Sequence, residues 1–88
     1  MPSPGGWKEV LGGVVTPELR NYFEQALNGL DGASYEPIAL LATQLANGTN
    51  YKFQAIAKTV GVDDVEATKI VIINVNPMGV ATLISIED

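Results

Sequence analysis

Residues 35–60 have the sequence YEPIALLATQLANGTNYKFQAIAKTV, in which the apolar residues recur with a period close to two. The pair Asn47-Gly48 divides it into two runs that are rich in apolar and β-branched residues. Asparagine and glycine both tolerate a positive φ, so the pair is a strong signal for a tight hairpin turn. We therefore expect two long antiparallel strands, over 35–45 and 50–60, with the turn between them.

The second of these strands alternates between apolar and polar side chains, as a strand with one exposed face does. Its apolar face consists of Tyr51, Phe53, Ala55 and Ala57. In the first strand we expect Ile38, Leu40 and Ala42 to share one face. Pro37 is expected near the start of that strand, where a missing backbone N–H is tolerated.

Two more strands are expected towards the C-terminus. The first covers 67–75 and contains the run 70–73 (Ile-Val-Ile-Ile), which is apolar on both faces of a strand. The second covers 80–86, and the sequence Asn-Pro-Met-Gly at 76–79 predicts the turn that joins the two.

An amphipathic helix is expected ahead of the first hairpin. Thr16 is suited to cap it, Pro17 to its first position and Glu18 to the positive end of the helix dipole. The helical apolar stripe consists of Leu19, Tyr22, Phe23, Ala26, Leu27 and Leu30. Glycines at 29 and 32 predict the end of the helix.

These elements predict a single α+β domain over residues 1–88, with one helix packed across a four- to five-stranded antiparallel sheet. The strand count stays open because Gly12-Gly13 interrupts the apolar residues of segment 10–15. Residues 1–6 are rich in proline, glycine and serine, so we expect them to form a flexible N-terminal arm.

The 88 residues include no cysteine and no histidine. Disulfides and thiolate metal sites are therefore excluded, and no imidazole is available as a general base or metal ligand. We expect no catalytic residues, no enzyme activity, no cofactor and no metal. A cysteine-free chain without a secretory signal is typical of a reducing compartment, so we expect a cytoplasmic location.

Five basic and ten acidic residues give the chain a net charge of −5 at pH 7. Such an acidic chain is not expected to bind nucleic acid. No apolar run approaches the roughly 20 residues of a membrane span, so we expect no membrane partner. A protein partner is expected instead, because the turn at 76–79 presents the apolar side chain of Met78 to solvent.

Strands of alternating direction would bring the turns at 44–50 and 76–79 to the same end of the sheet, with the arm beside them. The segment Gln44-Leu45-Ala46-Asn47-Gly48-Thr49-Asn50-Tyr51 resembles the first hairpin loop of the cystatin family. The signature of that loop is Gln-x-Val-x-Gly, often followed by Thr-Asn-Tyr. Gly5-Gly6 resembles the family's N-terminal glycine, and Pro77 resembles the start of its second loop. The order of elements matches that of the family over essentially the whole chain. The lack of cysteine and of a signal is similar to the intracellular stefin branch, and Gly5-Gly6-Trp7 resembles plant cystatins.

This resemblance implies a reversible, non-covalent inhibitor of papain-like cysteine proteases. The arm and the two hairpin loops would occlude the active-site cleft, with the protease-binding residues Gly5, Gly6, Gln44, Leu45, Ala46, Asn47, Gly48, Pro77 and Met78. Two positions depart from the family. Ala46 replaces the central valine, at a cost on the order of 1–2 kcal/mol of binding. Met78 replaces a frequent tryptophan, so this contact is smaller and more flexible.

Two other interpretations stay open. The first is a cystatin-fold binding or structural module that inhibits nothing, in which Asn47-Gly48 is only a turn and Gln44 only a solvent-facing strand residue. The second is a small enzyme or ligand carrier, which would need an apolar cavity under the sheet. We expect a monomer that can also form a domain-swapped dimer by straightening the hairpin at 45–47.

Overall fold

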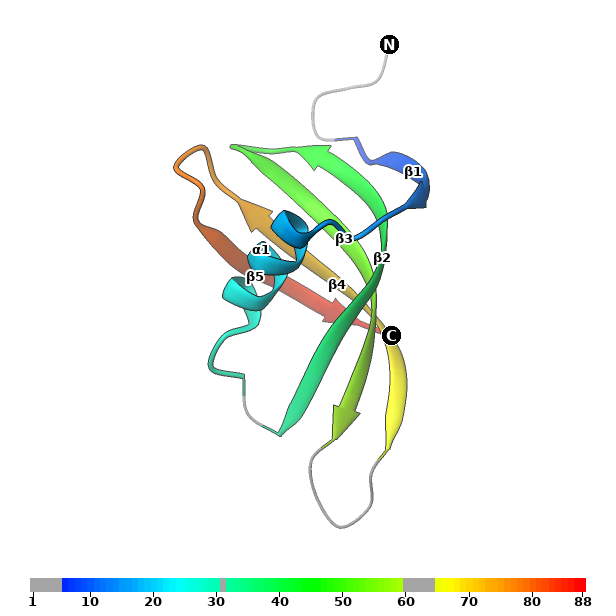
Figure 1. The fold of residues 1–88 in the computed structure, drawn as a ribbon. Coiled ribbons are helices and arrows are strands. Elements are labelled where there is room, and N and C mark those ends of the chain that lie inside the picture. Colours follow the sequence, from blue (N-terminus) through cyan, green and yellow to red (C-terminus); the bar gives the residue numbers. More distant parts are fainter. Residues whose placement is uncertain (1–5, 31, 60–64) are drawn as a thin grey trace.

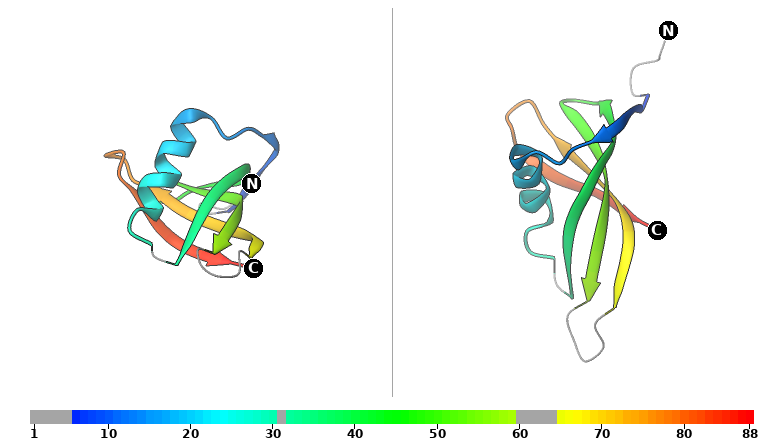
Figure 2. Two further views of the ribbon diagram at one scale, coloured as in Figure 1. Left: turned by 60° about the horizontal axis from the view of Figure 1, so that its bottom comes forward. Right: turned by 45° about the vertical axis from the view of Figure 1, so that its right-hand side comes forward.

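The computed structural model describes residues 6–30, 32–59 and 65–88. This part of the chain forms β1 (Lys8–Gly13), α1 (Pro17–Leu27), β2 (Ala33–Leu45), β3 (Thr49–Thr59), β4 (Glu66–Val75) and β5 (Ala81–Glu87). The strands form one antiparallel sheet in sequence order, and α1 lies across one of its faces (Figure 1). Figure 2 shows the same two layers from two other directions. The expected α+β arrangement is confirmed, and β1 is the fifth strand.

The start of α1 is the one that the sequence predicted. The Leu19 N–H donates a hydrogen bond of 3.2 Å to Thr16 Oγ1, and Pro17 occupies the first turn. The predicted stop at Gly29 is confirmed, because the helix ends at Leu27, Asn28 caps it and Gly29 has a positive φ of 92°. The placement of Leu30 on the helical stripe was wrong, since Leu30 lies beyond the end of the helix. The backbone leaves the helix at Asn28, whose N–H bonds to the carbonyl of Gln25 three residues back, a tightened turn that is common at helix ends.

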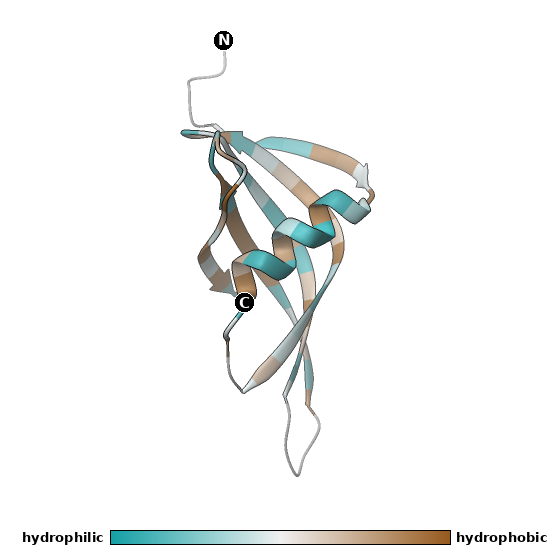
Figure 3. Ribbon diagram, turned by 60° about the vertical axis from the view of Figure 1, so that its left-hand side comes forward, coloured by the Kyte–Doolittle hydropathy of each residue, from teal (hydrophilic) through white to brown (hydrophobic). Residues whose placement is uncertain are grey.

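The core lies between α1 and the sheet. Phe23 of the helix meets Phe53 of β3 edge to face, with ring centroids 5.2 Å apart, and both rings are buried. Edge-to-face packing places a positive ring edge against a negative ring face, which is favourable for aromatic pairs. The side of α1 turned away from the sheet is largely hydrophilic (Figure 3). The expected inward face of β3 is also confirmed, since Ala55 and Ala57 are buried with Phe53 and Tyr51 packs against the cluster.

The prediction that Ile38, Leu40 and Ala42 share one face was wrong. Strand β2 carries an extra residue relative to β3 at two places, between Pro37 and Ala39 and between Leu40 and Ala42. Each β-bulge shifts the alternation by one residue and bends the strand. As a result Leu40 pairs with Phe53 on the helix side, Ala42 pairs with Lys52 on the opposite side, and Ile38 is exposed.

Strand β4 is buried on both faces near its centre, as its apolar run predicted. Val71 and Ile73 are fully buried in the core cluster under α1. Ile72 points to the opposite side, which we call the outer face, and is also buried. It pairs in register with Lys52, whose aliphatic stem is suited to cover apolar surface. In the described part of the chain, no helix is both long and apolar enough to cross a membrane.

Candidate functional site

Two turns and the start of β1 lie at one end of the sheet (Figure 1). The turns join β2 to β3 and β4 to β5. Lys8 of β1 pairs with Thr43 near the end of β2, which places Gly6 at the same end. We call the segments 44–50 and 76–80, together with Gly6, the hairpin end. The prediction that the two turns are neighbours is confirmed, whereas Gly5 lies outside the described residues.

The first turn has the backbone conformation that Asn-Gly predicted. Asn47 has a φ of 42° and Gly48 a φ of 100°. The Ala46 N–H donates a hydrogen bond of 3.2 Å to the Gly48 carbonyl across the turn. Both central residues therefore occupy the positive-φ region that asparagine and glycine accept at low cost.

Gly48 also packs against the second hairpin. A Cβ added to it would lie 2.1 Å from the Val75 carbonyl oxygen and 2.7 Å from Asn76 Cα. No other residue type fits this contact without moving one of the two hairpins. The two hairpins are thus in direct backbone contact at Gly48.

Asn76 organises the second turn. Its side-chain Oδ1 accepts hydrogen bonds from the N–H groups of Met78 and Val80, at 2.9 and 3.0 Å. Its carbonyl accepts another from the Gly79 N–H at 2.8 Å. Sequence reasoning identified this turn but missed the role of Asn76. The available signal was an asparagine directly before proline, a pair that favours this kind of turn.

Three side-chain amides form a row across the strands on the outer face, next to the first turn. Asn50 Nδ2 donates to Gln44 Oε1 at 2.8 Å, and Asn74 Nδ2 donates to Asn50 Oδ1 at 2.9 Å. Asn74 Nδ2 also donates to the Ala46 carbonyl at 3.1 Å. We call this row the amide ladder. The sequence indicated Gln44 as a site residue but not Asn74, although a polar residue between the apolar run 70–73 and Val75 was a signal.

The hairpin end presents uncharged and partly apolar surface. Leu45 is 77% exposed and Met78 is 86% exposed. Val80 is also exposed, although the sequence did not indicate it as a site residue. Segments 44–50 and 74–80 contain no charged residue. Exposed apolar side chains gathered at two adjacent turns are typical of a surface that binds another protein.

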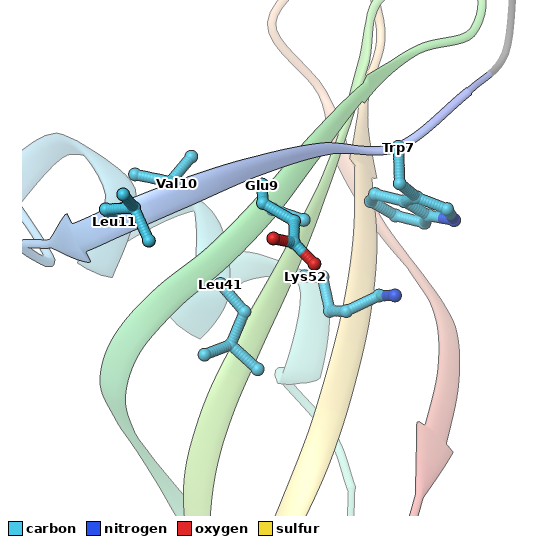
Figure 4. A pocket seen from close by; sticks show the side chains of 7 residues that line it. Trp7, Glu9, Val10, Leu11, Leu41 and Lys52 are labelled. Atoms are coloured by element: carbon cyan, nitrogen blue, oxygen red, sulfur yellow. The ribbon is translucent and has the colours of Figure 1, made fainter.

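Trp7 lies on the outer face, just before β1. Lys52 Nζ stands 4.4 Å from the centroid of its ring, which is a cation–π contact. Beside this pair is an open hollow of about 430 Å³ that Glu9, Leu11 and Leu41 also line (Figure 4). The hollow lies on the side of the sheet opposite α1, so it is not the cavity under the sheet that a ligand carrier would need.

Asp88, whose carboxyl has a shifted pKa, lies away from the hairpin end. A hydrogen bond from Lys69, near the other end of β4, and the charge of that lysine lower the pKa of the Asp88 carboxyl. Within the described ranges, no three acidic side chains come together in a way that could hold a metal ion.

Comparisons with family models, with curated proteins and with solved structures found no match.

Proposed function

We propose that the protein is a cystatin-like, reversible, non-covalent inhibitor of papain-like cysteine proteases. One observation carries the proposal: two hairpin turns are fastened side by side, and each presents an exposed apolar side chain, Leu45 or Met78. The motif resemblance at 44–51 and the strand order support the same conclusion. In this proposal the domain has the cystatin fold, and the hairpin end enters the active-site cleft.

The geometry of the first turn suits a wedge that resists cleavage. Ala46 and Gly48 are small, so the backbone of the turn can approach the walls of a narrow cleft closely. The Ala46 carbonyl accepts a hydrogen bond from Asn74, which directs this carbonyl towards the second hairpin. A carbonyl held in this way is poorly placed for attack by a catalytic thiolate. Inhibition then needs no covalent step and no cofactor.

The second turn supplies the other contact, through Pro77 and Met78. Methionine is flexible and polarisable, so it can fill an irregular apolar pocket. Gly6 is exposed at the same end and would continue the contact into the substrate-binding side of the cleft, together with Gly5. A standard interface of about 1,600 Å² would suffice, although buried area alone does not set affinity.

A non-inhibitory binding module of the same fold is the second candidate. Ala46 favours it, because an alanine offers less apolar surface at the centre of the turn than the valine of the family signature. In both candidates we propose a monomer that acts on a protein partner rather than on nucleic acid or a membrane. We also propose a cytoplasmic location, which the cysteine-free sequence supports.

Titration of active papain with the protein tests the proposal. We expect reversible inhibition that competes with substrate, and equal binding to papain whose catalytic cysteine is blocked by a small methylthio group. Met78→Asp should weaken inhibition strongly, because a charge would enter an apolar contact. Ile84→Asp is the matched control, since Ile84 is an exposed residue of β5 outside the hairpin end. No inhibition at micromolar protein would reject the inhibitor proposal and leave the binding module.

A further inference from the structure

The amide ladder joins three strands at the base of the two turns. Gln44, Asn50 and Asn74 are direct neighbours in the register of β2, β3 and β4, so their side chains project from the same face. All three are half-buried. The ladder reaches the first turn at the Ala46 carbonyl, which is 28 residues away from Asn74 in the sequence.

The direction of the hydrogen bonds in the ladder is determined at its Ala46 end. A backbone carbonyl can only accept, so the group of Asn74 that faces it must be the amide nitrogen. The second N–H of that nitrogen then donates to Asn50 Oδ1, and Asn50 Nδ2 donates to Gln44 Oε1. Asn74 therefore acts purely as a double donor on this side, with both of its partners being acceptors.

The side chain of Asn76, two residues further along, accepts hydrogen bonds, whereas that of Asn74 donates them. Its Oδ1 accepts from two backbone N–H groups of the second turn. A carboxylate could replace the amide of Asn76 without losing either bond, whereas a carboxylate at position 74 would face two acceptors. An aspartate at position 74 therefore adds a charge and removes two donated hydrogen bonds, whereas an aspartate at position 76 adds only the charge.

We propose that Asn74 is a positioning residue for the first turn, holding the Ala46 carbonyl and coupling the two hairpins into one preformed binding surface. The other described contact between the first turn and the second hairpin is the packing of Gly48 against Val75 and Asn76. A surface that is ordered before binding loses less conformational freedom when the complex forms, so its affinity is higher. The consequence for binding rests on the proposed inhibitor function, whereas the positioning role is a property of the free protein.

The first test uses free protein and backbone amide NMR of Ala46, Asn47 and Gly48. For Asn74→Asp at neutral pH we expect large shift changes and faster hydrogen exchange at these three amides. Asn76→Asp adds the same charge but keeps its two hydrogen bonds, so it should change the amides of Ala46 and Asn47 much less, although its backbone contacts Gly48. On acidification the introduced carboxyl gains an O–H donor, so the shifts of Asn74→Asp should return part of the way. Segments 44–50 and 74–80 carry no other charged group, and Lys52 is one row away on the outer face.

The second test measures papain inhibition by Asn74→Asp and by Thr68→Asp, which adds the same charge at the exposed far end of β4. We expect Asn74→Asp to weaken inhibition by about tenfold or more and Thr68→Asp to change it little. If Asn74→Asp fails to fold, Asn74→Ala removes both donors without a charge and should give the same NMR response.

Equal NMR responses of Asn74→Asp and Asn76→Asp, or an unchanged first turn in Asn74→Ala, would overturn the positioning role. A wild-type protein that does not inhibit papain would instead reject the proposed function, while the NMR result would still decide the role of Asn74.

Discussion

Gly48 and Val75 are in direct backbone contact, so close that a Cβ on the glycine would stand 2.1 Å from the Val75 carbonyl oxygen. Gly48→Ala must therefore separate the two hairpins, in addition to straining a φ of 100°. We expect a loss of about 2–4 kcal/mol in the free energy of unfolding. Chemical denaturation measures this loss, and papain inhibition should weaken with it.

Gly79→Ala is the control for this prediction. Gly79 also has a positive φ, of 84°, but a Cβ there would meet nothing within 4 Å. Its substitution should cost only the backbone strain, about 1 kcal/mol. Equal losses for the two variants would show that the contact between the hairpins contributes nothing.

Gln25 ties the helix to the edge of the sheet. Its Oε1 accepts a hydrogen bond of 3.1 Å from the Ala81 N–H at the start of β5. Gln25→Ala should lower the free energy of unfolding by about 1–2 kcal/mol, because a shielded backbone donor loses its partner. Thermal unfolding checks this. Glu24→Ala, one residue away on the exposed side of α1, should cost much less, and a similar loss would contradict the prediction.

Ala46→Val places the valine of the cystatin signature at the centre of the first turn, and its effect on papain inhibition tests the proposed function. Two added methyl groups should contribute on the order of 1–2 kcal/mol to binding, or roughly tenfold in the papain inhibition constant. Ala67→Val, on the exposed far end of β4, is the control and should leave the constant unchanged. An unchanged constant for Ala46→Val would indicate that this side chain does not touch the protease.

The Lys69–Asp88 pair predicts a modest pH dependence of stability. The lysine's hydrogen bond and charge lower the pKa of Asp88 in the folded protein. The stabilisation is therefore fully present above the ordinary pKa of an aspartate and is lost as the pH falls through the lowered value. An NMR titration of the Asp88 carboxyl should show the lowered pKa, and Lys69→Met should restore it. Lys58→Met, which removes a lysine that pairs with Glu66 instead, should not.

The first turn is also the proposed hinge for a domain-swapped dimer. Asn47→Val disfavours the φ of 42° that the closed turn requires, so it should raise the dimer fraction after heating and cooling. Gel filtration across protein concentrations measures that fraction. Asn47→Gly keeps the positive φ accessible and should behave like wild type. A monomer under all conditions for Asn47→Val would count against the swap.

The sequence predicted the features that depend on neighbours along the chain. Thr16 and Pro17 start the helix through contacts within its first turn, and Asn47-Gly48 forms a turn through its own backbone preferences. The positions of the β2 bulges and the hydrogen-bond partners of Asn74 could not be predicted in this way. They depend on how β2 and β4 align with β3, and pairing across strands has no local signal in the residues themselves.

The two bulges in β2 have a joint consequence for Gln44. Each bulge moves the residues that follow it to the other face of the sheet. After both bulges, even-numbered residues such as Gln44 again point to the outer face, as they did before the first bulge. With only one of them, Gln44 would turn towards the helix and the row of amides would lose its end member. An insertion or deletion of two residues in this strand should therefore be tolerated more easily than one of a single residue. A change by an odd number of residues would turn core-facing side chains to solvent and solvent-facing side chains to the core.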